Sequence, residues 1–251
     1  MRVYCCLNQK GGVGKSTTTY NLGAGLALAG KKVLLIDLDP QANMTKFLGV
    51  SADNGSITDL LTGMKKAKDI IIRRSENLAV IPSSISLSGA EFKLFAEPGR
   101  ELLLKEAMDG IKGFDYCLID CPPSLGLLTV NALTWARDII IILQPEFAPL
   151  EGVANLVDTI RVVKQRLNKS IDISGVIITM YDSRIRLHKE VCEEVGRHFN
   201  NKVYATKISR RSVLAEAPSH GKTIFEYASK DAASKAFTEL SQEFIDRSGK
   251  K

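Results

Sequence analysis

Seven consecutive residues decide the fold: Gly11-Gly12-Val13-Gly14-Lys15-Ser16-Thr17. They follow an apolar run at residues 3–7 and open a helical pattern at residues 16–29, which is the strand–turn–helix setting of a phosphate-binding P-loop. The glycines let successive backbone N–H groups wrap a phosphate, and the helix N-terminus adds partial positive charge. We expect Lys15 to reach the β- and γ-phosphates and Ser16 to ligate Mg²⁺. The motif predicts a nucleoside triphosphate site.

The rest of the chain alternates strand-length apolar runs with helix-length segments, as βαβ units do. Several of the runs are apolar on both faces, as central strands covered by helices should be. A serine-rich run at residues 83–88 is expected to be a loop. The pattern predicts one α/β domain over residues 1–251, with a mostly parallel, twisted sheet and helices on both faces. Strands are expected at residues 3–7, 33–36, 78–81, 116–119, 139–143, 173–179 and 203–204, and helices at 16–29, 102–108, 125–134, 150–167, 187–199 and 232–245.

Two of these strands end in carboxylates. Residues 114–120 form a hydrophobic run that ends in Asp120, the Walker B arrangement that places an aspartate beside the metal at the carboxyl end of a sheet. The second strand ends in Asp-Leu-Asp-Pro-Gln, and the two-residue period of a strand puts Asp37 and Asp39 on one side. Beside a P-loop, this pair indicates catalysis or metal contact.

Composition and charge fit a globular protein with an anion-binding surface. The chain has 251 residues, of which 45% are hydrophobic and 25% charged, and a net charge of +6. These values are ordinary for one globular domain. Residues 184–222 hold nine basic and four acidic side chains, so most of the positive excess lies there. An excess confined to one segment predicts a surface that binds a polyanion.

The sequence also bears on location. No run approaches the roughly 20 apolar residues that a membrane-spanning helix needs, and the first residues lack the pattern of a secretion signal. We therefore expect a cytoplasmic protein. The cysteines are odd in number and mostly have apolar neighbours, which predicts reduced thiols in the core. They are Cys5, Cys6, Cys117, Cys121 and Cys192.

Beyond the P-loop, five stretches carry a resemblance to a known family. They read Asn-Gln-Lys at residues 8–10, Asp-Leu-Asp-Pro-Gln at 37–41, Asp-Cys-Pro-Pro-Ser at 120–124, Thr-Met-Tyr-Asp at 179–182 and Glu-Ala-Pro-Ser-His-Gly-Lys at 216–222. On these residues the chain resembles the ParA/Soj family of deviant Walker A partition ATPases, within the ParA/MinD superfamily. The resemblance spans nearly the whole sequence.

The resemblance implies a role for individual residues. Lys10 matches the signature lysine that reaches the phosphates of the partner's nucleotide in an ATP-bound sandwich homodimer. Asp39 matches the residue that positions the attacking water, while Asp37 and Asp120 match groups near Mg²⁺ that act through its waters. The loop that contacts adenine commonly reads Pro-Arg-Asn in the family, and here it reads Ser209-Arg210-Arg211. A switch that senses the γ-phosphate corresponds to Pro122, Pro123 and Ser124.

The resemblance also implies a cycle. Homodimers of this family with bound ATP and Mg²⁺ bind double-stranded DNA without sequence preference, so the protein would associate with the nucleoid. A ParB-type centromere-binding protein stimulates their slow ATP hydrolysis and releases them, during chromosome or plasmid partitioning. The basic segment at residues 184–222 is the candidate DNA-binding surface. Its candidate contacts are Arg197, Lys202, Arg210, Arg211 and Lys222.

Two other functions share parts of this sequence pattern. A MinD-like membrane-cycling ATPase needs a C-terminal amphipathic helix with a basic face. Here Phe237, Leu240 and Phe244 form an apolar stripe that is interleaved with acidic residues, so we expect this helix to pack on the sheet and not on a membrane. An ATP-driven reductase like the nitrogenase iron protein needs thiolates that hold a cluster. Cys117 and Cys121 flank the Walker B strand, where core packing explains them better.

Overall fold

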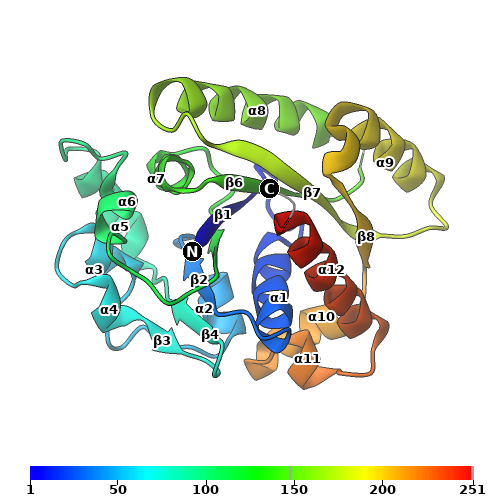
Figure 1. Cartoon of the computed structure of the whole chain (residues 1–251), viewed down its shortest axis with the longest axis horizontal. Coiled ribbons are helices and arrows are strands. Elements are labelled where there is room, and N and C mark those ends of the chain that lie inside the picture. Colours follow the sequence, from blue (N-terminus) through cyan, green and yellow to red (C-terminus); the bar gives the residue numbers. More distant parts are fainter. Residues whose placement is uncertain (147–148, 250–251) are drawn as a thin grey trace.

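The computed structural model describes residues 1–146 and 149–249, with no account of the side chains of residues 149–154. The chain forms three layers, in which helices cover both faces of an eight-stranded sheet (Figure 1). The strand order is β3-β4-β2-β5-β1-β6-β7-β8. The predicted α/β fold with a mostly parallel sheet is confirmed.

All neighbouring strands run parallel except β3, which pairs antiparallel with β4 at the edge of the sheet. The two-residue β3 is too short to leave a pattern in the sequence. β8 is longer than predicted, because its half-exposed residues lack a continuous apolar run. The strands are β1 (Arg2–Leu7), β2 (Val33–Asp37), β3 (Ile72–Arg73), β4 (Leu78–Ile81), β5 (Tyr116–Asp120), β6 (Asp138–Leu143), β7 (Asp172–Tyr181) and β8 (Val203–Ser209).

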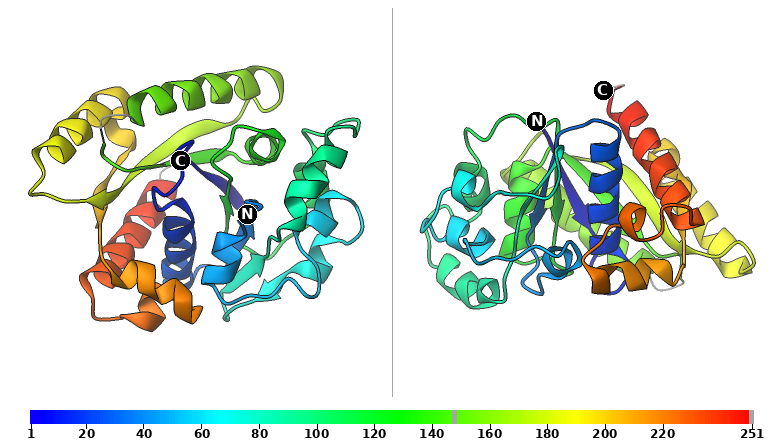
Figure 2. Two further views of the ribbon diagram at one scale, coloured as in Figure 1. Left: turned by 180° about the vertical axis from the view of Figure 1, so that it is seen from behind. Right: turned by 90° about the horizontal axis from the view of Figure 1, so that it is seen from below.

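The two faces of the sheet carry different sets of helices (Figure 2). One face is covered by α1 (Lys15–Leu28), α2 (Asn43–Phe47), α10 (Val213–Glu216), α11 (Ile224–Tyr227) and α12 (Ala232–Ser248). The opposite face is covered by α3 (Ile57–Leu61), α4 (Ala67–Ile70), α5 (Ser86–Leu94), α6 (Leu103–Ala107), α7 (Leu127–Trp135), α8 (Pro149–Arg166) and α9 (Arg186–Phe199). Two 3₁₀ turns, η1 (Asn200–Lys202) and η2 (Ala217–His220), connect these elements.

The core is divided by the sheet. Along β1, Val3, Cys5 and Leu7 face one side, and Tyr4 and Cys6 face the other. This alternation of buried side chains on both faces is what a central strand covered by helices requires. The thiols of β1 and β5 are free and buried, as predicted, and burial raises the pKa of Cys6 to about 12.

The expectation of a loop over residues 83–88 is wrong in its second half, because α5 begins at Ser86. Leu87, Ala90 and Leu94 follow a helical spacing and are buried against the core. The helical spacing is hard to see in the sequence because a serine-rich run is typical of a loop. In the structure, the hydroxyl groups of Ser84 and Ser86 bind each other and neighbouring side chains at the start of the helix.

The C-terminal helix α12 packs against α1 and β8. Its apolar residues Phe237, Leu240 and Phe244 are at most 1% exposed. At Gly25 of α1 the two helices come so close that an added Cβ would lie 2.1 Å from the Oγ atom of Ser241. The predicted docking of this helix onto the body of the protein is confirmed.

We expect Gly25→Ala to lower the free energy of unfolding by about 1–3 kcal/mol, because the new methyl group forces α1 and α12 apart. Urea denaturation measures the change. Gly89→Ala in α5 is the matched control, since a Cβ there meets no atom within 4 Å and alanine favours a helix. Equal effects of the two substitutions would contradict the close packing at Gly25.

Candidate functional site

The glycine-rich loop lies between β1 and α1, at the carboxyl edge of the sheet. Gly12 and Gly14 have φ angles of 77° and 81°, a left-handed conformation that favours glycine. A Cβ added at Gly11 or Gly12 would meet no atom of the described residues within 4 Å, so the loop forms an open cradle lined by backbone. The Oγ1 atom of Thr179 donates a hydrogen bond of 2.7 Å to the carbonyl of Val13 and ties the loop to β7.

The side chain of Lys15 is buried between two carboxylates, one at the end of β5 and one in the segment just after β2. Its Nζ atom lies 3.4 Å from Oδ1 of Asp120 and 3.9 Å from Oδ2 of Asp39. Burial by itself lowers the pKa of Lys15, but the negative charges of Asp120 and Asp39 outweigh it and raise the pKa above its ordinary value. The lysine is therefore a fixed positive charge at the floor of the loop.

Asp120 has an oxygen that is available to a ligand. Burial raises the pKa of Asp120, while Lys15 and the hydroxyl group of Ser16 act in the opposite direction. Its Oδ2 atom is buried and has no hydrogen-bond partner among the described residues. Buried polar atoms are rarely left unpaired, so this oxygen beside Ser16 fits a metal ion or a water that the metal holds.

Asp37 lies next to Asp120 in the register of β2 and β5. Burial and the charge of Asp120 raise the pKa of Asp37 to about 7. Its Oδ2 atom accepts hydrogen bonds from the backbone N–H and the hydroxyl group of Thr45, at 2.8 and 2.7 Å, and Oδ1 accepts one from the N–H of Asp39. Because both oxygens already bind protein donors, Asp37 is placed to act on a metal through water.

Within the described residues, no group of three or more His, Cys, Asp or Glu side chains is arranged to hold a metal ion. The residues predicted for Mg²⁺, Ser16, Asp37 and Asp120, therefore offer only part of a coordination shell. Mg²⁺ usually keeps several waters and shares its shell with substrate phosphates. The site fits a metal that arrives together with a nucleotide.

Asp39 and Lys10 occupy separate positions at this edge. The Oδ1 atom of Asp39 accepts a hydrogen bond of 2.9 Å from the N–H of Gln41, while Oδ2 faces Lys15. Lys10 forms an ion pair with Glu146 in the segment that follows β6. Sequence reasoning missed Glu146, because nothing near it in the chain marks it as a partner of Lys10.

The predicted switch residues follow directly after β5. Pro122 is buried, whereas Pro123 and Ser124 are exposed at the carboxyl edge. The hydroxyl group of Thr129 donates a hydrogen bond of 2.6 Å to the carbonyl of Ser124, which connects this loop to α7. The loop therefore links the metal side of the site to a helix of the core.

A cavity of about 470 Å³ opens beside the glycine-rich loop. Gly14, Thr17 and Thr18 form one wall, and Ser209 and Arg211 belong to another, so the two adenine-loop candidates do lie next to the P-loop. The remaining lining residues come from the end of β7 and from the segment around the Ser209–Arg211 loop, and the sequence motifs did not assign them to a pocket. These include Thr179, Met180, Ile208, Arg210, Ser212, Leu214 and Ala215.

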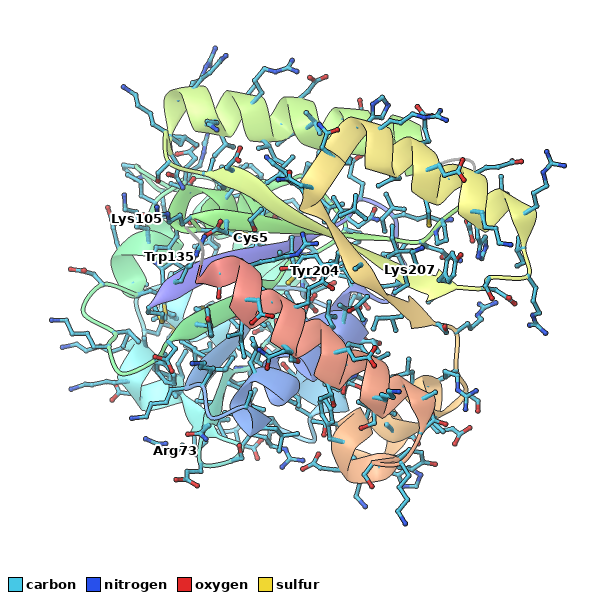
Figure 3. All side chains as sticks on the ribbon, turned by 45° about the vertical axis from the view of Figure 1, so that its right-hand side comes forward. Cys5, Arg73, Lys105, Trp135, Tyr204 and Lys207 are labelled. Carbon is cyan, nitrogen blue, oxygen red and sulfur yellow. The ribbon has the colours of Figure 1, made fainter. Side chains whose placement is uncertain are left out.

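The structure separates the five candidate DNA contacts into two groups at opposite ends of β8. Arg197 and Lys202 precede the strand, and Arg210, Arg211 and Lys222 follow it. A seven-residue strand spans roughly 23 Å. Arg197, Lys202 and Arg211 form ion pairs with Glu194, Asp172 and Asp231, respectively. The same strand carries Tyr204 and Lys207, labelled in Figure 3.

Comparisons with known proteins bear on the whole chain. A family model described as an AAA domain matches residues 1–173. The sporulation initiation inhibitor protein Soj of Bacillus subtilis is 46% identical over 246 residues, covering 96% of this chain and 97% of that protein. The chromosome-partitioning ATPase Soj of Treponema pallidum is 45% identical and covers 98% of this chain and 97% of that protein.

A solved structure shares both fold and sequence with this chain. It is cobyrinic acid a,c-diamide synthase from Mycobacterium smegmatis with a bound ATP analogue and magnesium. The two chains are 36% identical, with a TM-score of 0.85, over 98% of this chain and 94% of that one.

We expect Lys15→Ala to lower the stability of the nucleotide-free protein by about 3 kcal/mol at pH 8, because it leaves buried carboxylates without their cation. The loss should shrink as the pH is lowered from 8 to 5, because burial raises the pKa of Asp120 and a protonated carboxyl group loses less when the cation is removed. Urea denaturation at both pH values measures the difference, with the exposed Lys66→Ala as control. A loss that is absent or independent of pH would contradict the charge coupling.

The sequence motifs, the geometry of the site and the similarity to known proteins all indicate a nucleotide-binding protein. The glycine-rich loop, the buried lysine and the three aspartates meet at one edge of the sheet, as the sequence motifs predicted. The similarity to the two Soj proteins extends over nearly the full length of this chain and of those relatives. The chain therefore belongs to the Soj/ParA family of chromosome-partitioning ATPases.

Proposed function

We propose that this chain is a Mg²⁺-dependent ATPase for chromosome or plasmid partitioning, whose ATP-bound sandwich homodimer binds DNA without sequence preference. A ParB-type centromere-binding protein stimulates its slow hydrolysis and so releases it from DNA. The observation that carries the proposal is the buried cluster of Lys15, Asp39 and Asp120 below a glycine cradle, in a chain similar to partitioning proteins over almost its full length.

ATP binding uses the loop and the cavity beside it. Backbone N–H groups of residues 11–17 surround the phosphates, and Lys15 exchanges its carboxylate partners for phosphate oxygens. The base enters the cavity that Ser209 and Arg211 line. Ser16 would hold Mg²⁺ directly, while Asp37 and Asp120 would hold it through water. The bound ion supplies positive charge that offsets the charge of the phosphates.

Asp39 orients the attacking water. One of its carboxylate oxygens is held by the N–H of Gln41, which leaves the other directed toward the phosphate side of Lys15. A carboxylate fixed in this way orders a water molecule without large motion of the chain. The slow turnover suits a protein whose nucleotide state sets how long it stays in one place.

Dimerisation depends on Lys10. In the single chain its ammonium group is engaged by Glu146. To reach the nucleotide of a second copy, it exchanges one carboxylate for phosphate oxygens, which carry more charge. Because the phosphates of ATP bound to the second copy provide the new partner, we expect dimerisation to depend on ATP, as the resemblance to the family implies.

In the dimer, the basic segments of the two copies form two weak DNA-binding sites that are held rigidly together. Each basic segment makes few phosphate contacts and binds DNA weakly at physiological salt. In the dimer, the second contact becomes intramolecular, so affinity rises steeply. This couples ATP binding to residence on the nucleoid in the cytoplasm. Arg210 and Lys222 have no ion-pair partner among the described residues, and this makes them the best-placed contacts.

The MinD-like alternative is disfavoured by the packing of α12. Its apolar stripe is buried against α1 and β8, so that face is not available to a membrane surface. Among the described residues no helix is long and apolar enough to span a bilayer. Cluster-holding cysteines are equally disfavoured, since Cys117 and Cys121 are fully buried in the core.

We expect Asp39→Ala to retain Mg·ATP affinity but to hydrolyse ATP of order a hundredfold more slowly, because the group that orients water acts mainly in the transition state. Calorimetry measures binding and phosphate release measures turnover. Asp53→Ala, at an exposed carboxylate, serves as control. Turnover like that of the wild type would rule out this role for Asp39.

The proposed function as a whole is tested with random-sequence DNA and anionic liposomes, each with ATP, ADP or no nucleotide. We expect co-sedimentation with DNA only in ATP. Lys222→Ala should weaken DNA binding about equally for all sequences and reduce the salt slope by about one per lost phosphate contact. Lys66→Ala, on the opposite face of the sheet, should change neither.

Two results would argue against this function. ATP-dependent binding to liposomes without binding to DNA would favour the MinD-like alternative. An unchanged salt slope in Lys222→Ala would place the DNA contacts elsewhere on the molecule.

A further inference from the structure

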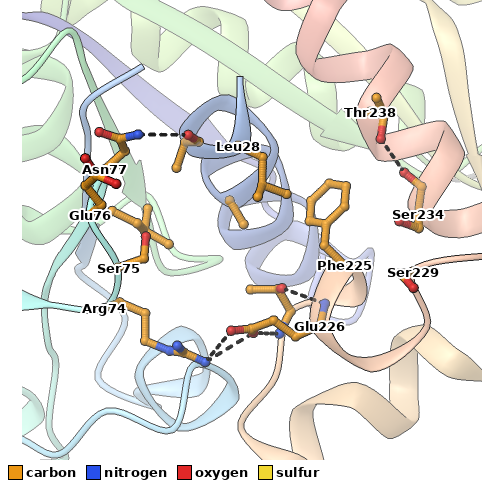
Figure 4. A pocket seen from close by; sticks show the side chains of 14 residues that line it. Leu28, Arg74, Ser75, Glu76, Asn77, Phe225, Glu226, Ser229, Ser234 and Thr238 are labelled. Carbon is orange, nitrogen blue, oxygen red and sulfur yellow. Dashed lines mark hydrogen bonds and ion pairs between the residues drawn. The ribbon is translucent and has the colours of Figure 1, made fainter. Parts of the chain in front are cut away.

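Arg74, in the turn between β3 and β4, joins the end of α2 to the segment at residues 221–226, which is far from it in the sequence. Figure 4 shows its contact with Glu226. Its Nε atom donates a hydrogen bond of 3.1 Å to the carbonyl of Leu48, just after α2. Its Nη2 atom donates to the carbonyl of Gly221, at 3.2 Å, and to the carboxylate of Glu226 in α11, at 3.1 Å. The planar guanidinium group matches such a set of acceptors, which an ammonium group cannot contact in the same way.

Two of these segments also touch through their backbones. Gly49 and Gly221 have φ angles of 62° and 61°, and a Cβ added at Gly221 would lie 3.0 Å from Cα of Gly49. No side chain separates the two glycines. Because closely packed groups move together, a shift of the turn after α2 displaces the turn at residues 217–222.

In its middle, at Thr45, α2 is bound to the nucleotide site. Thr45 of α2 donates two hydrogen bonds to Asp37, and its hydroxyl group accepts one of 2.9 Å from the N–H of Ser83. A displacement of Asp37 therefore displaces α2 through these hydrogen bonds. The helix has only five residues, so it transmits such a change as one rigid turn.

The turn at residues 217–222 leads to the basic surface. It includes Lys222 and continues without a break from α10, which follows the loop of Arg210 and Arg211. The chain of contacts thus runs from Asp37 through α2 to the segment that carries three of the five candidate DNA contacts.

We propose that Arg74 is a positioning residue that clamps α2 to residues 217–222, and so makes DNA binding respond to the state of the nucleotide site. This inference rests on the proposed function, whose regulation it describes. Coupling of this kind is reciprocal and typically changes an affinity by about 5- to 150-fold. Arg74 itself contacts neither the P-loop nor the cavity beside it.

The substitution Arg74→Ala is suited to a test. Arg74 lines a cavity of about 680 Å³ between α1, α11 and α12, and its side chain is 27% exposed. Water can therefore replace the guanidinium group without leaving a void in the core. The neighbouring Arg73→Ala is a matched control, because Arg73 is exposed and, among the described residues, its side chain donates only to the carbonyl of Glu76, three residues away.

We expect Arg74→Ala to keep the ATP affinity of the wild type within about threefold, while the ratio of DNA affinities in ATP and ADP falls about tenfold. Arg74→Lys should recover part of that ratio, and Arg73→Ala should keep all of it. An unchanged ratio in Arg74→Ala overturns the proposal. A parallel loss of ATP affinity and thermal stability also overturns it, because it indicates a structural role only.

Hydrogen exchange with Mg·ATP and no DNA tests the clamp separately from the proposed function. In the wild type, nucleotide should slow exchange both in the P-loop and at residues 217–222. In Arg74→Ala, the protection of the P-loop should remain and that of residues 217–222 should be lost. If the wild type shows coupled protection but no ATP-dependent DNA binding, the proposed function fails and the clamp stands. If protection at residues 217–222 persists in Arg74→Ala, the clamp fails.

Discussion

The rest of the site depends on one interaction, the buried ion pairing of the Lys15 ammonium group with the carboxylates of Asp39 and Asp120. A buried charge is costly unless it is paired, so neither the lysine nor the aspartates could occupy this place alone. The pairing requires the ends of β1, β2 and β5 to lie side by side, which the strand order β2-β5-β1 provides. A triphosphate can then compete for a cation that the protein already holds in position.

The two buried aspartates Asp37 and Asp120 differ in how many of their carboxylate oxygens already have a hydrogen-bond partner in the protein. Both oxygens of Asp37 accept hydrogen bonds from the protein, whereas one oxygen of Asp120 has no partner among the described residues. The first carboxylate is therefore suited to hold α2 and to act through water, and the second to meet a ligand. Two aspartates on neighbouring strands thus differ in role because their surroundings differ.

A series of contacts connects the nucleotide site to the segment next to the basic surface. Thr45 connects Asp37 to α2, and the backbone contact of Gly49 with Gly221 connects α2 to the segment that follows the basic loop. On the same face of the sheet, α12 is packed tightly on α1, and its apolar side chains Phe237, Leu240 and Phe244 are buried. These features favour a protein whose output is binding to another macromolecule.

The sequence alone determined the fold class, the P-loop and the strand ends that carry Asp37 and Asp120, because these depend on local spacing and on apolar runs that any parallel sheet buries. It could not show β3, the start of α5 or the full length of β8, whose patterns are too short or too exposed. Tertiary structure alone decided that Glu146 pairs with Lys10, that Arg74 joins α2 to Gly221, and that the basic segment divides into two groups at the ends of β8. Such contacts join residues tens to more than a hundred positions apart, and only the packing of the whole chain specifies them.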